Sequence, residues 1–179
     1  MVATDGQGAT AAYEPVEMVF RETGNVLDYL VAPARLEVSL LAEARRLAVS
    51  TIKKMQGKGI FGVEMFLTLQ GELLINEISP RTHNSGHYTT EACQTSQFVQ
   101  QLNILSGKPL GSTDQIRPAV MFNLLGAEGF DGDTVVEGAD QATNDPSVWV
   151  HLYGKNRCFP GRKMGHVTVM ADTVDEALE

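Results

Sequence analysis

The 179-residue chain lacks most of the features that define special structural classes. It has only two cysteines, Cys93 and Cys158, which stand far apart and form no CxxC or Cys/His pattern. This argues against a disulfide scaffold and against a structural zinc site. No run approaches the roughly 18 apolar residues of a membrane span, and the first six residues lack the charged start and apolar segment of a signal peptide. We therefore expect a globular protein of the reducing cytoplasm without a membrane partner.

Basic residues are scarce as well, since 14 Lys and Arg face 22 Asp and Glu. The net charge of -8 argues against a general nucleic-acid binder. The stretch between Asp145 and Asp172 nevertheless contains no acid. Its four cations, called the basic island below, are Lys155, Arg157, Arg162 and Lys163. A basic island in an acidic chain suits a phosphate or carboxylate ligand, and a solvated basic loop is the alternative.

Apolar periodicity divides the chain into elements of both kinds. Helical spacing predicts a helix over 36–55, which Gly57 and Gly59 end. A second helix is predicted over 91–105, with Phe98, Leu102 and Leu105 on one face. Composition predicts strands over 60–68, 72–78, 118–125, 148–153 and 165–170, and a turn over 21–25. The expected fold is α+β with a β-rich final third, and the spacing of Thr173 and Glu176 predicts a capping box at its end.

The strands 60–68 and 72–78 flank Gln70-Gly71 and are predicted to form a β-hairpin. A loop centred on Gln70-Gly71 places Glu64 directly opposite Glu77, with Cβ atoms about 4.5–5.5 Å apart. Two carboxylates in that position destabilise a hairpin unless a cation such as Mg²⁺ or Mn²⁺ lies between them, or one of them is protonated. A three-residue loop would instead place Asn76 opposite Glu64. An exposed polar face, on which both glutamates contact water, is a further interpretation.

The segment 79–88 is polar and interrupted by Gly and Pro. The planar guanidinium of arginine can donate two hydrogen bonds to one anion, and histidine can accept or release a proton near pH 7. Gly86 would let the backbone approach a ligand closely. The segment is expected to hold a second substrate, and a hydrogen-bonded structural loop is the alternative. Its functional side chains are those of Arg81, His83, Asn84, Ser85 and His87.

Gly154 and Gly161 permit tight turns within the basic island, so its cations could converge on one anion. The chain contains no GxxxxGK[ST] or GxSxG motif, which excludes the Walker-type phosphate loop and the nucleophile elbow of the α/β-hydrolases.

Several of these runs resemble one family. Phe61 to Glu64 and Asn76 to Arg81 are similar to the metal-binding end of the ATP-grasp superfamily. The run from His83 to Cys93 is more specific and resembles the 5-(carboxyamino)imidazole ribonucleotide synthases, the ATPase subunits of phosphoribosylaminoimidazole carboxylase in purine biosynthesis. Further matching runs are 95–98, 118–121, 123–126, 153–155 and 160–166.

The resemblance implies a function and a set of roles. Family members use ATP and bicarbonate to carboxylate 5-aminoimidazole ribonucleotide through carboxyphosphate. Glu64 and Glu77 would hold Mg²⁺ or Mn²⁺ on the ATP phosphates, with Asn76 beside them. The side chains facing bicarbonate or carboxyphosphate would be Arg81, His83, Asn84 and Ser85. The side chains gripping the substrate phosphate would be Lys155 and Arg162, with Lys163 as a helper.

The resemblance also implies a domain plan and a homodimer. Residues 1–125 would form the C-terminal part of an ATP-grasp domain, and residues 126–179 a small β-rich C-terminal domain. Family members are about twice this length, so the chain is expected to be an inactive C-terminal fragment. Another ATP-grasp ligase, such as a biotin carboxylase, and a non-catalytic binding or assembly module are the alternatives.

Overall fold

A computed structural model describes residues 1–21 and 26–179, so most of the predicted turn at 21–25 lies outside the described residues. The chain forms two compact units. Met1–Val16 and Pro33–Ile116 make the first unit, and Glu17–Ala32 and Arg117–Glu179 make the second. This division differs from the expected boundary between residues 125 and 126, because the segment 17–32 pairs with strands of the second unit.

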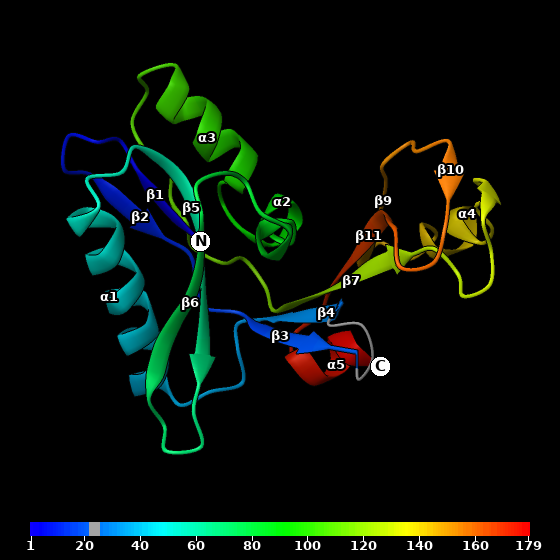
Figure 1. Cartoon of the computed structure of the whole chain (residues 1–179), viewed down its shortest axis with the longest axis horizontal. Helices are drawn as coiled ribbons and strands as arrows, with labels where there is room; N and C mark the ends of the chain where they lie inside the picture. Colours follow the sequence, from blue (N-terminus) through cyan, green and yellow to red (C-terminus); the bar gives the residue numbers. More distant parts are fainter. Residues whose placement is uncertain (22–25) are drawn as a thin grey trace. The chain divides into compact units, whose positions relative to one another are not determined.

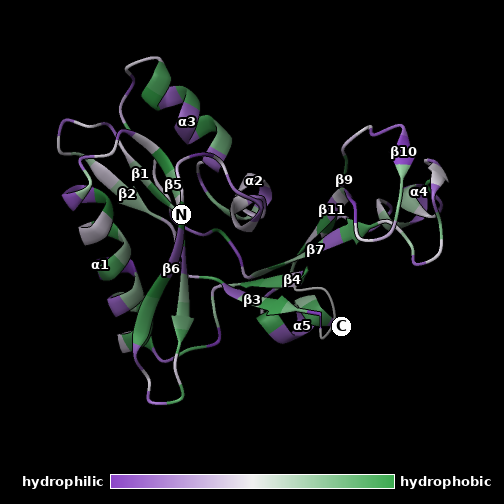
Figure 2. Cartoon of the chain, viewed as in Figure 1, coloured by the Kyte–Doolittle hydropathy of each residue, from purple (hydrophilic) through white to green (hydrophobic). Residues whose placement is uncertain are grey.

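The first unit is built on a four-stranded antiparallel sheet with the order β2-β1-β5-β6 (Figure 1). Helix α1 packs on one face, where Ile52 lies in a core with Val2 and Phe61. The buried residues of α1 recur every fourth position, so the helix alternates polar and apolar residues along its length (Figure 2). The bounds are β1 (Val2–Thr4), β2 (Thr10–Ala12), α1 (Val38–Lys54), β5 (Gly59–Leu67) and β6 (Leu73–Ser79). The predicted helix and hairpin are confirmed.

The continuous helix predicted over 91–105 is wrong. Residues 84–105 instead form three short elements, η1 (Asn84–Gly86), α2 (Thr89–Ala92) and α3 (Gln97–Leu105). The chain is extended at Ser96, whose side chain accepts from the Val99 N–H and caps α3. The apolar face of α3 that carries Leu102 and Leu105 is exposed, and its buried side holds Gln97, Gln100 and Ile104 instead.

The second unit contains a five-stranded antiparallel sheet with the order β3-β4-β7-β11-β9. Helix α5 packs on it through Ala177, which contacts Val31 and Val120. The predicted capping box of Thr173 and Glu176 begins α5. The bounds are β3 (Glu17–Phe20), β4 (Leu27–Ala32), β7 (Ala119–Leu125), β8 (Gly132–Asp133), α4 (Ala139–Ala142), β9 (Val148–Leu152), β10 (Arg157–Cys158), β11 (Lys163–Met170) and α5 (Val174–Leu178). The α+β class is confirmed, and in the part of the chain that the structure describes no helix could cross a membrane.

Candidate functional site

The hairpin of β5 and β6 places Glu64 directly opposite Glu77, as predicted. The loop is nevertheless the three-residue alternative, because the Thr68 N–H donates to the Glu72 carbonyl at 2.9 Å and Gly71 adopts a positive φ of 83°. A β-bulge between the loop and the glutamates restores the pairing. Asn76 is the extra residue of that bulge, so the expectation that a three-residue loop puts Asn76 opposite Glu64 is wrong.

The two carboxylates lie on the sheet face opposite the α1 core, since neighbouring strand residues alternate between faces and Val63 packs on that core. Ser79 Oγ donates to Glu77 Oε1 at 3.0 Å. Glu64 is half-buried, and its Oε1 lies 3.7 Å from His83 Nε2. Among the described residues no cluster of three His, Cys, Asp or Glu side chains could bind a metal by itself. Two paired carboxylates fit a hard cation that takes its other ligands from phosphates and water.

His83 connects the segment 79–88 to β5, the strand that carries Glu64. Its ring packs over β5 at Gly62, where an added Cβ would lie 3.0 Å from the His83 Cβ and Cγ. Its Nδ1 accepts from the Ser85 N–H and lies 2.9 Å from Ser85 Oγ. An accepting Nδ1 leaves the proton of the neutral ring on Nε2, the nitrogen that faces Glu64. The Glu64 carboxylate and His83, a candidate for binding the anion, therefore lie next to each other in the first unit.

The buried Gln97 on α3 is a residue that the sequence analysis did not assign to the site. Its side-chain amide pairs with the backbone of His83, accepting from the N–H at 2.8 Å and donating to the carbonyl at 2.8 Å. An added Cβ at Gly86 would lie 2.5 Å from Gln97 Oε1, so this glycine is required for packing against Gln97. Its sequence signal was its place in the matching run 95–98, since a glutamine in the first turn of a helix does not by itself indicate such a contact.

Arg81 and Asn84 occupy the same segment with different surroundings. Arg81 is exposed, and its guanidinium donates to the Thr82 carbonyl at 3.0 Å. Asn84 is half-buried and begins η1. Their contact with bicarbonate or carboxyphosphate stays a prediction.

The basic island forms a connected group in the second unit. Lys155 Nζ donates to the Lys163 carbonyl and lies 5.5 Å from the centre of the Tyr153 ring. Tyr153 Oη lies 2.9 Å from His166 Nδ1, and partial burial raises the pKa of the Tyr153 phenol. Because the phenol stays neutral, the Tyr153 ring can hold the Lys155 side chain in place without neutralising the charge of its ammonium group.

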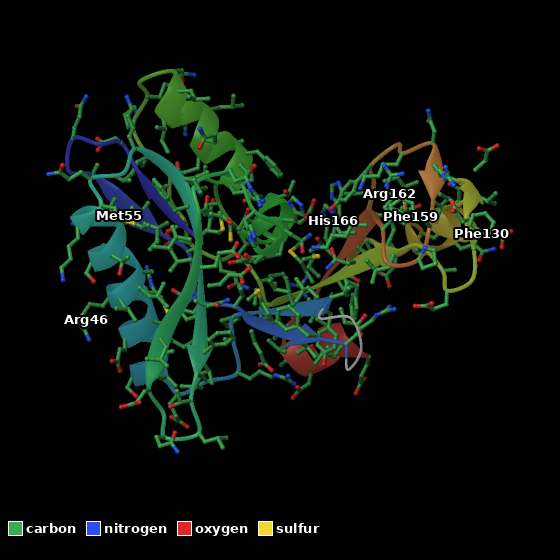
Figure 3. All side chains as sticks on the ribbon, viewed as in Figure 1. Arg46, Met55, Phe130, Phe159, Arg162 and His166 are labelled. Carbon is green, nitrogen blue, oxygen red and sulfur yellow. The ribbon has the colours of Figure 1, made fainter. Side chains whose placement is uncertain are left out.

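Arg162 follows a tight turn in which Gly161 has a positive φ of 72° and the Arg162 N–H donates to the Phe159 carbonyl. Pro before such a glycine is typical of a type II turn. The Arg162 guanidinium lies 5.1 Å from the centre of the Phe159 ring, and the two residues lie side by side in Figure 3. It also donates to the Arg157 carbonyl at 2.6 Å.

Arg157 has a different environment from the other cations of the basic island. Its guanidinium donates twice to the Asp131 carboxylate, at 2.7 and 2.9 Å. This bidentate pair lowers the pKa of the Asp131 carboxyl and raises that of Arg157. Arg157 is therefore a structural cation of the loop, whereas the site assignment of Lys155, Arg162 and Lys163 stays a prediction.

Two family models match these two regions. An ATP-grasp domain matches residues 1–98, which contain both carboxylates and the segment 79–88. The chain belongs to the ATP-grasp family. The C-terminal domain of phosphoribosylaminoimidazole carboxylase matches residues 119–179, which contain the basic island. The resemblance read from the motifs is thereby confirmed.

Individual relatives support the same assignment. The N5-carboxyaminoimidazole ribonucleotide synthase of Bacillus subtilis is 43% identical over 155 residues, covering 87% of this chain and 39% of that protein. The crystal structure of the Thermotoga maritima synthetase has a TM-score of 0.91 and 48% identity, covering 99% of this chain and 47% of that one. The Aspergillus clavatus synthase, in complex with ADP and 5-aminoimidazole ribonucleotide, has a TM-score of 0.87 and 36% identity, covering 98% and 47%. The chain thus spans less than half the length of these relatives.

Proposed function

We propose that this ATP-grasp chain supplies part of an enzyme that carboxylates 5-aminoimidazole ribonucleotide with bicarbonate and ATP through carboxyphosphate. The pairing of Glu64 with Glu77 on one sheet face carries the proposal. The likeness to synthases of this class along almost the whole chain supports it. A homodimer in the cytoplasm completes the proposal.

The residues divide into three roles. Glu64 and Glu77 hold Mg²⁺ or Mn²⁺, and Asn76 on the bulge lies next to Glu77 at the nucleotide. When bound, the cation neutralises charge on the ATP phosphates. The residues that orient bicarbonate or carboxyphosphate are Arg81, His83, Asn84 and Ser85. Lys155 and Arg162, assisted by Lys163, bind the phosphate of the ribonucleotide.

The direct test is a chimera in which this chain replaces the matching part of the Thermotoga maritima synthetase. The chimera should release phosphate from ATP only when bicarbonate and the aminoimidazole ribonucleotide are supplied. Glu64→Gln and Glu77→Gln should each lower kcat by about 100-fold or more, because each removes a charge that stabilises the transferring phosphoryl group. The isolated chain should show no turnover, since phosphoryl transfer needs charge neutralised from several sides at once.

Glu72→Gln is the matched control, because Glu72 is an exposed carboxylate at the loop of the same hairpin. It should leave kcat within twofold of the unmodified chimera. Equal losses in all three variants, or a chimera that folds and binds ATP but never turns over the ribonucleotide, would contradict the proposed roles.

A further inference from the structure

Gln97 and Gln100 are two fully buried glutamines on one helix, and each pairs with the backbone of a single residue. Gln97 pairs with His83 through both its amide oxygen and its amide nitrogen. Gln100 does the same with Gly111, at 2.9 and 2.8 Å. The two contacts have the same chemistry, but only His83 belongs to the segment assigned to the substrate anion.

The backbone of His83 determines which end of the Gln97 amide is nitrogen. Only an oxygen can accept from the His83 N–H, and only a nitrogen can donate to the His83 carbonyl. Gln97 Nε2 also lies 3.0 Å from His87 Nδ1. Because an amide nitrogen is a donor only, His87 Nδ1 must accept. The neutral His87 ring then carries its proton on Nε2.

Two further contacts hold this arrangement in place. The His87 ring stacks on Phe98 of α3, with centroids 5.7 Å apart and an interplanar angle of 17°. Thr89 Oγ1 donates to the Gly86 carbonyl at 2.6 Å and accepts from the Gln97 N–H at 2.9 Å. Both ends of the segment 83–87 are therefore tied to the first two residues of α3.

We propose that Gln97 is a positioning residue, which sets the backbone of the segment 83–87 and selects the His87 tautomer with its proton on Nε2. This rests on the proposed function only in one respect, namely that the segment faces bicarbonate or carboxyphosphate. His87 presents a hydrogen-bond donor at Nε2 as a result, which suits an anion. Gln97 itself contacts no substrate in this proposal.

The first measurement is the ¹⁵N spectrum of the histidine rings in the isolated chain, at a pH above the ordinary histidine pKa of about 6.5. His87 Nδ1 should give the resonance of an unprotonated ring nitrogen. In Gln97→Glu the carboxylate can only accept, so Nδ1 should become protonated and its resonance should move to that of an N–H nitrogen. Gln100→Glu should leave His83 and His87 unchanged.

The second measurement is turnover of the chimera described above. Gln97→Glu should lower kcat/KM for bicarbonate at least tenfold, while Gln100→Glu stays within twofold and unfolds at a similar temperature to Gln97→Glu. An unmoved His87 Nδ1 resonance in Gln97→Glu, or equal effects of both variants on turnover, would overturn the proposal. If the unmodified chimera lacks turnover, the proposed function fails, and the ring spectrum alone decides the positioning role.

Discussion

At the scale of single residues, small side chains decide where the functional ones lie. Gly62 makes room for the His83 ring, and Gly86 makes room for Gln97. Gly126 does the same in the second unit, where its N–H donates to the Arg162 carbonyl and its carbonyl accepts from the Gly161 N–H. A side chain at any of these positions would displace a neighbour that carries a charge or a hydrogen bond. The sequence shows these glycines without showing what packs against them.

Gly126→Ala tests this packing in the basic island. An added Cβ would lie 2.0 Å from the Phe159 carbonyl oxygen, so the turn before Arg162 must move. We expect a loss of about 1–3 kcal/mol in the free energy of unfolding, which is usual for overpacking. Urea unfolding followed by tryptophan fluorescence measures it, because the single Trp149 lies on β9 of this unit. Gly132→Ala is the control, since its Cβ would lie 3.3 Å from the nearest atom, in the Phe130 ring. An unfolding midpoint for Gly126→Ala equal to that of the control would contradict the argument.

At the scale of elements, the break between α2 and α3 positions the site. The four residues 93–96 interrupt the helical periodicity, with Cys93 in an isolated bridge to Gln115 and Ser96 capping α3. This start brings the side chain of Gln97 to the backbone of His83. The apolar pattern predicted one continuous helix because it does not record the side-chain hydrogen bond by which Ser96 starts a new helix.

Ser96→Ala should therefore destabilise the start of α3. Loss of an N-cap serine costs about 0.5–2 kcal/mol, and the Val99 N–H loses its partner at 3.2 Å. Thermal unfolding and amide exchange of the first unit measure the loss. Ser106→Ala at the other end of the same helix removes only contacts to helical carbonyls and should change stability by less than about 0.5 kcal/mol. Equal losses in the two variants would argue against the cap.

At the scale of the whole molecule, the chain passes three times between its units. The segment 17–32 leaves the first unit, forms β3 and β4 of the second sheet, and returns at Pro33. Val31 pairs with Val120 across 89 positions of sequence, and Asn123 Nδ2 donates to the Leu27 carbonyl at 2.9 Å. Each unit is therefore built from two segments that are distant in the sequence, and its stability depends on buried groups from both segments.

Alkaline pH should weaken the first unit through such buried groups. Burial raises the pKa of the Cys93 thiol from 9.0 to about 12, and burial raises the pKa values of the Tyr13 and Tyr88 phenols above 10.0. The unfolded chain releases these protons first, so the free energy of unfolding should fall as pH rises above about 9. The slope is at most about 1.4 kcal/mol per pH unit for each group.

Urea unfolding between about pH 8 and pH 11 measures this slope. Cys93→Ala should flatten its first part, just above pH 9, where the unfolded thiol alone ionises. Cys158→Ala is the control, because Cys158 is only half-buried in the second unit. Stability that does not change up to pH 11 would show that these groups are solvated in the folded protein.

The sequence by itself determined most local elements, the α+β class and the hairpin that carries Glu64 and Glu77, and it left the pairing of these two residues open between two loop lengths. Helical spacing, strand composition and turn residues act over a few positions, and a hairpin needs only a short loop and its flanking strands. The family motifs are likewise short runs that can be read without a fold. Only the tertiary structure decided that a bulge at Asn76 pairs Glu64 with Glu77 and that the segment 17–32 joins the second sheet. It also decided that the Gln97 side chain pairs with the backbone of His83. These depend on contacts between residues far apart in the chain, whose free energy depends on packing that no local pattern records.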